Sequence, residues 1–211
     1  MGKDLRWRPD GEFWLSLALT CAVAVLLVVV DARWAPLRHL DDAVTRDTNA
    51  FVGRHPGLVG PLRATSYVFH PWVFRVVVLV LAWWSARRGA RQVAAWAVAT
   101  IVVAAVVEWT LKALVGRSRP MPPSPIAHAP GGSFPSGHAM TAAVGCAVIL
   151  LILRPAWRKI AWAAAVALTL VAGACRILLG VHYVSDVIAG WLLGAAIVAA
   201  TCSAGRPWVG K

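Results

Sequence analysis

Long apolar runs with few charged side chains are the feature that most restricts how this chain can fold. A transmembrane helix needs roughly 20 consecutive apolar residues to cross the hydrocarbon core of a bilayer. Six runs approach that length: Phe13–Val30, Ala64–Ala86, Val93–Leu111, Ala139–Leu153, Ile160–Ala174 with its continuation to Leu179, and Val187–Ala204. They lack the polar face that a helix in a soluble bundle turns toward water. We therefore predict an all-α integral membrane protein with six transmembrane helices, forming a single domain over residues 1–211.

The composition agrees with that prediction. Of the 211 residues, 59% are hydrophobic and 14% are charged, whereas a soluble domain has about 45–50% apolar and about 25% charged residues. The four cysteines all fall inside apolar runs without a metal-binding spacing, so we interpret them as packing residues and expect no disulfide framework.

Basic residues in alternate connections predict the orientation of the helices. They precede the first run, lie between the second and third and between the fourth and fifth, and follow the sixth: Lys3, Arg6, Arg8, Arg87, Arg88, Arg91, Arg154, Arg158, Lys159, Arg206 and Lys211. By the positive-inside rule both termini are cytoplasmic. The net charge of +12 is then largely a topology signal, and we predict no nucleic-acid partner. We expect the first run to be a retained helix, because its end is a poor signal-peptide cleavage site.

Two external connections differ from each other. Leu37, Leu40, Val44 and Phe51 have helix-like spacing among charged residues, which is typical of a short helix in the membrane interface, although a packed loop helix fits nearly as well. Residues 116–137 are rich in proline and glycine, which excludes a regular helix and predicts a rigid external loop. Such a loop is a frequent place for a functional site.

The predicted topology brings the unusual polar residues of the second half to the outer end of the bundle. Lys112, Arg119 and Arg176 are three cations suited to phosphate, with Arg117 a possible fourth. Ser136 and Gly137 lie where backbone N–H groups at a helix start can bind an anion. Ionisable residues gathered at one membrane level indicate a function.

Two histidines accompany these cations. His182 and Asp186 are four residues apart, so a carboxylate can orient the imidazole, and His138 comes from the opposite connection. Two imidazoles beside several cations suit phosphoryl transfer, in which one attacks phosphorus and the other protonates the leaving oxygen. Alone, Lys112 and Arg176 also fit interface snorkelling, and His182 with Asp186 also fits a structural helix cap.

Three motifs resemble those of the type-2 phosphatidic acid phosphatase family, which shares its site with vanadium-dependent haloperoxidases. They are KALVGRSRP at 112–120, PSGH at 135–138 and RILLGVHYVSD at 176–186. The resemblance implies that Lys112, Arg119, Ser136, Gly137 and Arg176 bind phosphate. It also implies that His138 is the general acid, that His182 forms a phosphohistidine and that Asp186 orients His182. No metal or other cofactor is implied.

One position departs from the family pattern: Cys175 stands where the family usually has serine before the arginine of the third motif. A thiol is a weaker hydrogen-bond donor than a hydroxyl, so we expect modestly lower phosphate affinity. We interpret Cys175 as a packing residue or a supporting one, with His182 as the nucleophile.

These residues predict a plasma-membrane enzyme that hydrolyses a phosphomonoester or pyrophosphate of a lipid at the extracytoplasmic face. Candidate substrates are a polyprenyl diphosphate such as undecaprenyl diphosphate, phosphatidylglycerol phosphate and phosphatidic acid. Two alternatives remain. A lipid phosphotransferase would use the same histidine, and a non-catalytic binder or transporter of anionic lipid would use only the charge. The oligomeric state is not predicted.

Overall fold

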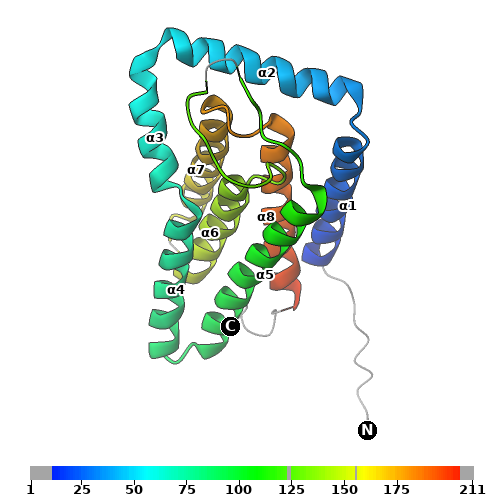
Figure 1. Cartoon of the computed structure of the whole chain (residues 1–211). Coiled ribbons are helices and arrows are strands. Elements are labelled where there is room, and N and C mark those ends of the chain that lie inside the picture. Colours follow the sequence, from blue (N-terminus) through cyan, green and yellow to red (C-terminus); the bar gives the residue numbers. More distant parts are fainter. Residues whose placement is uncertain (1–10, 123–124, 155, 205–211) are drawn as a thin grey trace.

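The chain folds into a bundle of helices, and one transverse helix lies across an end of the bundle (Figure 1). The structure is a computed structural model, and it describes residues 11–122, 125–154 and 156–204. These residues contain helices and no strand: α1 (Gly11–Asp31), α2 (Ala35–Arg54), the 3-10 turn η1 (Pro56–Leu58), α3 (Val59–Val68), α4 (Pro71–Arg87), α5 (Arg91–Val115), α6 (Gly137–Leu153), α7 (Arg158–Leu178) and α8 (Val184–Ala204).

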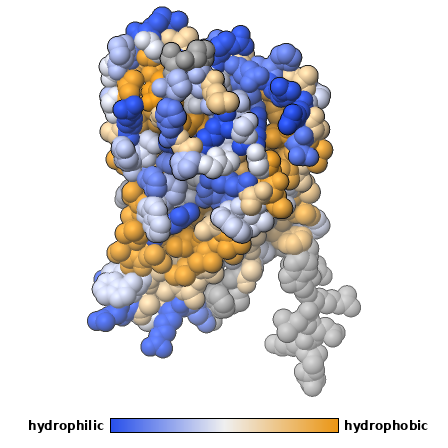
Figure 2. Space-filling model, in the orientation of Figure 1, coloured by the Kyte–Doolittle hydropathy of each residue, from blue (hydrophilic) through white to orange (hydrophobic). Residues whose placement is uncertain are grey.

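The prediction of an all-α membrane bundle is confirmed. Within the described part of the chain, five helical segments are long and apolar enough to cross a membrane: α1, the η1–α3–α4 segment Pro56–Arg87, α5, α7 and α8. The sixth, α6, has 17 residues, at the lower end of the range of about 17–25 for a spanning helix. It contacts α4, α5, α7 and α8, so it lies inside the bundle. Figure 2 shows a band of apolar side chains between hydrophilic ends.

The second apolar run forms two helices rather than one. α3 ends at Val68 and α4 begins at Pro71, with His70 as its N-cap. Proline is favoured at the first position of a helix and disfavours helical geometry in the residue before it. The Nδ1 atom of His70 accepts a hydrogen bond from the Trp72 N–H at 3.3 Å, which fixes the imidazole at the break.

The helix α2 lies across one end of the bundle (Figure 1) and turns a largely polar face inward. Its buried residues are Asp41, Thr45, Asn49 and Val52, whereas Leu40 and Phe51 are exposed. The prediction of a helix in this connection is therefore confirmed, but its bundle-facing stripe is not the apolar one. The reason is its position, because it covers the polar end of the bundle instead of the apolar core.

Four helix ends meet beneath α2. α5 ends where Gly116 adopts a left-handed conformation, with φ of 55°, which glycine tolerates without the steric penalty that other residues meet. The chain then runs irregularly to the start of α6 at Gly137, while α7 ends at Leu178 and α8 begins at Val184. The terminal basic residues Lys3, Arg6, Arg8, Arg206 and Lys211, on which the predicted location of the termini rests, lie outside the described residues.

Candidate active site

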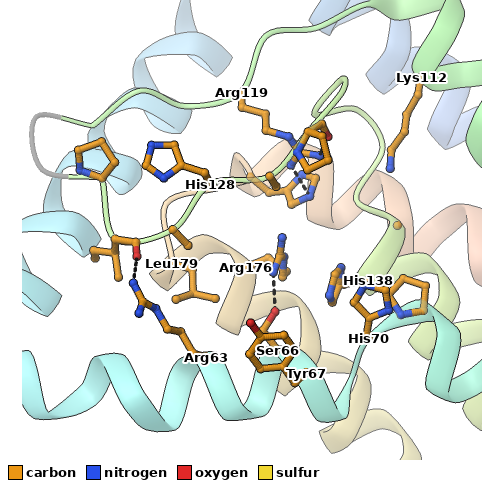
Figure 3. A pocket seen from close by; sticks show the side chains of 18 of the residues that line it. Arg63, Ser66, Tyr67, His70, Lys112, Arg119, His128, His138, Arg176 and Leu179 are labelled. Carbon is orange, nitrogen blue, oxygen red and sulfur yellow. Dashed lines mark hydrogen bonds between the residues drawn. The ribbon is translucent and has the colours of Figure 1, made fainter.

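A cavity of about 610 Å³ opens among these helix ends. Six of the eight residues predicted to form the site line it: Lys112, Arg119, Gly137, His138, Arg176 and His182. Figure 3 shows Lys112 and Arg119 entering from one side, Arg176 from α7 near the centre, and His138 beside His70. The other two predicted residues, Ser136 and Asp186, are fully buried. Residues from motifs up to 74 positions apart in the chain are thus brought to one place.

His182 lies between a guanidinium and a carboxylate. Its Nε2 atom is 2.9 Å from Nη1 of Arg119, and its Nδ1 atom is 3.5 Å from Oδ2 of Asp186. Because arginine only donates hydrogen bonds, Nε2 carries the lone pair and the proton is on Nδ1, facing Asp186. The separation of 3.5 Å is too long for a good hydrogen bond, and Nδ1 has no hydrogen-bond partner among the described residues.

Burial sets the charge state of this imidazole. His182 is 2% exposed, and desolvation lowers its pKa to about 4, an effect that Asp186 opposes and that Arg119 and Arg176 reinforce. The ordinary pKa of histidine is about 6.5. His182 is therefore neutral at pH 7, with its Nε2 lone pair directed to the cavity side, which is the state that a nucleophile requires.

Arg119 is held by the irregular loop. Its Nε donates to the carbonyl of Gly131, and its Nη2 donates to those of Pro130 and Gly132. Its Nη1 donates to the carbonyl of Val181 as well as to His182. All five N–H groups of the guanidinium therefore have an acceptor. Lys112 and Arg119 are seven residues apart, a spacing that would place both on one face of a continuous helix. α5 ends at Val115, so Arg119 lies beyond the helix that carries Lys112. The loop brings the two together.

Lys112 is paired with a carboxylate inside the cavity. Its Nζ lies 2.7 Å from Oε1 of Glu108, and Arg75 lies 3.5 Å from the other oxygen of that carboxylate. Glu108 and Lys112 are four residues apart on α5, the spacing at which side chains of opposite charge meet on a helix face. A Cβ atom at position 137 would overlap the Glu108 carboxylate, so the close approach of α5 to the start of α6 requires glycine there.

Arg176 and His138 have unused polar atoms at the cavity. Nη1 of Arg176 donates to the hydroxyl of Ser66 at 2.5 Å, while its Nε has no partner among the described residues. Nε2 of His138 is likewise buried without a described partner. The His138 ring lies edge-on to that of His70, with centroids 5.3 Å apart. Buried polar groups are usually hydrogen-bonded, so these atoms suit a polar ligand.

Ser136 and Asp186 support the cavity from behind. The Ser136 N–H donates to the backbone carbonyl of Asp186 at 2.9 Å, which joins the starts of α6 and α8. Gly190 permits this packing, because a Cβ atom there would lie 2.6 Å from the Ser136 carbonyl oxygen. The Ser136 hydroxyl is buried without a described partner. Asp186 also accepts the Tyr183 N–H at 2.9 Å. His182 precedes α8, which begins at Val184, so it does not lie on a helix face with Asp186.

Arg117 is partly buried and does not line the cavity. It forms ion pairs with Asp186 at 2.6 Å and with Asp41 of α2 at 2.8 Å. Burial lowers its pKa, but the two carboxylates more than offset that effect and raise the pKa overall. In the sequence, Asp41 is one of several charged residues of an external connection, and its pairing with Arg117 was not predicted.

Other cavity residues were also missed. Arg63, Ser66, Tyr67, His70 and His128 line it. Neither His70 nor His128 was predicted as a site residue, and His128 is exposed at the cavity. The N-cap position of His70 before Pro71 was the only signal available. Cys175 is buried and its thiol donates to the carbonyl of Leu62 at 3.1 Å, in keeping with a supporting role.

The geometry combines a neutral imidazole, whose Nε2 lone pair accepts a hydrogen bond from Arg119, with a second imidazole and several cations in one cavity. Such a set can bind a tetrahedral oxyanion, attack its central atom and protonate a leaving oxygen.

Comparison with known proteins identifies the family. The profile described as PAP2 superfamily matches residues 92–208, more than half of the chain. The chain belongs to the PAP2 superfamily, and the resemblance found in the three motifs is confirmed.

Two curated relatives and one solved structure are similar to parts or all of the chain. Undecaprenyl-diphosphatase of Sulfolobus acidocaldarius is 43% identical over 65 residues, which are 31% of this chain and 30% of that protein. Phosphatidylglycerophosphatase B of Bacillus subtilis is 37% identical over 90 residues, 40% of this chain and 44% of that protein. The chain thus matches less than half the length of either relative.

The solved structure is the crystal structure of the first transmembrane PAP2-type phosphatidylglycerolphosphate phosphatase from Bacillus subtilis. It superposes with a TM-score of 0.80 over 92% of this chain and 97% of that one, at 19% identity. This likeness establishes the fold of the whole bundle.

Proposed function

We propose that this membrane protein is a lipid phosphatase that hydrolyses a phosphomonoester or diphosphate of a lipid through a phosphohistidine. The observation that carries the proposal is the shared cavity of His182, His138, Lys112, Arg119 and Arg176. Within it Nε2 of His182 has a lone pair and Nε2 of His138 has no described partner.

In the first step Nε2 of His182 attacks phosphorus, and the bond from phosphorus to the leaving oxygen breaks. His138 gives its proton to that oxygen, so a lipid alcohol leaves as the neutral alcohol and a lipid phosphate leaves with one negative charge fewer. Asp186, beside Nδ1 of His182, stabilises the positive charge that the phosphorylated imidazole acquires. In the second step His138 takes a proton from water, the water oxygen attacks phosphorus, and the nitrogen–phosphorus bond breaks.

Binding and charge stabilisation come from protein groups in this proposal. Lys112, Arg119 and Arg176 offset the charge of the phosphate oxygens, and Ser136 with the Gly137 N–H adds donors. Such cations can supply the electrostatic stabilisation that a metal ion gives in other phosphoryl transfers. We therefore propose that no metal or other cofactor is required.

The substrate is proposed to enter from the lipid with its tail in the bilayer, and the cavity to face the extracytoplasmic side of the plasma membrane. The basic turn between α4 and α5, with Arg87, Arg88 and Arg91, supports this orientation, because it lies at the other end of the bundle (Figure 1). The names of the relatives favour a polyprenyl diphosphate or phosphatidylglycerol phosphate, and phosphatidic acid has the same reacting group.

The proposal is tested by phosphate release from defined lipid phosphates in detergent or vesicles, with a chelator present. The wild-type protein should release phosphate, and His182→Ala should lose about six orders of magnitude in kcat, as removal of a nucleophile does elsewhere. Full activity of a folded His182→Ala variant would falsify the phosphohistidine step.

The same assay separates the alternatives. A phosphotransferase should form a new lipid phosphate when an acceptor alcohol is supplied, at the expense of free phosphate. A non-catalytic binder or transporter of anionic lipid should bind the lipid without any turnover.

A further inference from the structure

The transverse helix α2 contributes a buried charge to the catalytic end of the bundle. Asp41 has 0% exposure although its neighbour Asp42 is exposed. A buried carboxylate is costly unless it is paired and hydrogen-bonded. Each of its oxygens has partners: Oδ1 accepts the Ser185 N–H at 3.0 Å, and Oδ2 accepts from the Ser185 hydroxyl at 2.6 Å and from Arg117 at 2.8 Å.

Arg117 connects this carboxylate to the proposed catalytic pair. Its Nη2 donates to Asp41, and its Nη1 donates to Oδ1 of Asp186 at 2.6 Å and to the Ser185 hydroxyl at 2.7 Å. The guanidinium also lies over the ring of Tyr183, 4.2 Å from its centroid. The other oxygen of Asp186, Oδ2, is the one that faces His182. The guanidinium therefore holds the far oxygen of the carboxylate, while the near oxygen accepts the Tyr183 N–H and faces the imidazole.

The charges of this cluster determine what Asp186 can do. Arg117 contributes one positive charge, and Asp41 and Asp186 contribute two negative ones, so the buried group keeps a net negative charge beside His182. Without Asp41, Arg117 would neutralise Asp186 alone. The imidazole that becomes positive on phosphorylation would then face a neutral pair, and its counter-charge would be lost.

We propose that Asp41 is a positioning residue for the reaction, acting through Arg117 to orient Asp186 and to keep it effective as the counter-charge of His182. This inference rests on the proposed function. It gives α2 a part in catalysis, although no residue of that helix belongs to the three motifs, which begin at Lys112.

The test compares Asp41→Asn with the matched control Asp47→Asn, which removes an exposed carboxylate from the same helix. Asn retains an oxygen that can accept the Ser185 N–H, so the packing should survive. We expect kcat of Asp41→Asn to fall roughly 10- to 100-fold, as when supporting partners of a functional histidine are removed. KM should stay within about 3-fold, because Asp41 does not line the cavity. Asp47→Asn should match the wild type.

A double-mutant cycle distinguishes positioning from general stabilisation. If Asp41 acts through Asp186, adding Asp41→Asn to Asp186→Asn should reduce kcat by less than about 3-fold. Independent losses that multiply would overturn the inference, and so would wild-type kcat in Asp41→Asn. A wild-type protein that releases no phosphate from any lipid phosphate would instead contradict the proposed function. Thermal unfolding in detergent checks that each variant is folded.

Discussion

The two walls of the cavity differ in how firmly their polar groups are held. On the loop and α8 wall, which carries Arg119 and His182, Arg119 is held by several short contacts and His182 is almost wholly buried. Arg117 and Asp186 lie behind this wall and are paired with each other. On the wall formed by α3, Arg63 and Tyr67 are exposed. A single hydrogen bond of Arg63, to the carbonyl of Ile126, crosses to the loop at 2.8 Å.

This difference separates two tasks. A reacting group gains from being fixed before the substrate arrives, because no reorganisation is then needed during the reaction. A group that meets variable parts of a lipid headgroup gains from freedom. We therefore expect the loop and α8 wall to determine kcat, and the α3 wall to determine which headgroup is preferred.

His138→Ala tests the proposed proton donor, which lies at the start of α6 and lines the same cavity. We expect kcat to fall about 10²- to 10⁴-fold, the usual contribution of a general acid. The loss should be smaller for a lipid diphosphate than for a monophosphate of the same lipid. The reason is that a departing phosphate needs protonation less than a departing alkoxide does. Phosphate release from the matched pair of lipids measures this, and equal losses would contradict the role of acid.

The pH dependence tests the state of His182. Since the pKa of this residue is lowered to about 4, its neutral form should persist down to that pH, and kcat/KM should fall about tenfold per pH unit only below it. An acid limb near 6.5, the ordinary value for histidine, would contradict a buried neutral nucleophile. The measurement needs a lipid substrate whose own ionisation is followed separately.

Arg63→Ala tests the freer wall. We expect a change of about 3- to 10-fold in the preference between a diphosphate and a monophosphate of one lipid, mostly in KM, with kcat nearly unchanged. Arg63 lines the cavity, and its hydrogen-bond partner among the described residues is a loop carbonyl, so Arg63→Lys should retain the charge and much of the preference. A large fall in kcat for both substrates would show that the two walls do not divide the work in this way.

Cys175→Ser should have the smallest effect. The thiol lies behind Arg176 and donates to the carbonyl of Leu62 rather than into the cavity. Replacing it with the serine that the family usually has should change KM by less than about 3-fold. Inactivation by this substitution would contradict the supporting role, and kcat with KM for one lipid substrate measures it.

The sequence predicted the bundle and most of the site because both depend on local signals. Apolar runs indicate spans directly, and loop charges correctly brought Lys112, His138, Arg176 and His182 to one end. The details that failed depend on where helices stop. Lys112 and Arg119 are seven residues apart and His182 and Asp186 are four apart, spacings typical of a shared helix face, yet Gly116 ends α5 and α8 begins only at Val184.

Asp41 shows a second limit of sequence analysis. The connection that contains Asp41 has apolar residues at helical spacing, and this apolar stripe predicts a helix that buries its apolar face in the membrane interface. The stripe of Asp41, Thr45 and Asn49 has the same spacing. It could be recognised as the inward one only if the polarity of the surface beneath α2 were known. That surface is assembled from loops distant in the chain, which no local pattern reveals.

Because the five N–H groups of Arg119 already have acceptors, a phosphate can bind to this guanidinium only by replacing one of them. A phosphate oxygen can receive a hydrogen bond from this guanidinium only when a carbonyl of residues 130–132 or 181, or the imidazole of His182, gives one up. Among these partners His182 is the side chain, whereas the other four are backbone carbonyls. Arrival of the substrate would thus withdraw the donor from the very nitrogen that must attack, so that the reactive electron pair is released only when there is something to react with.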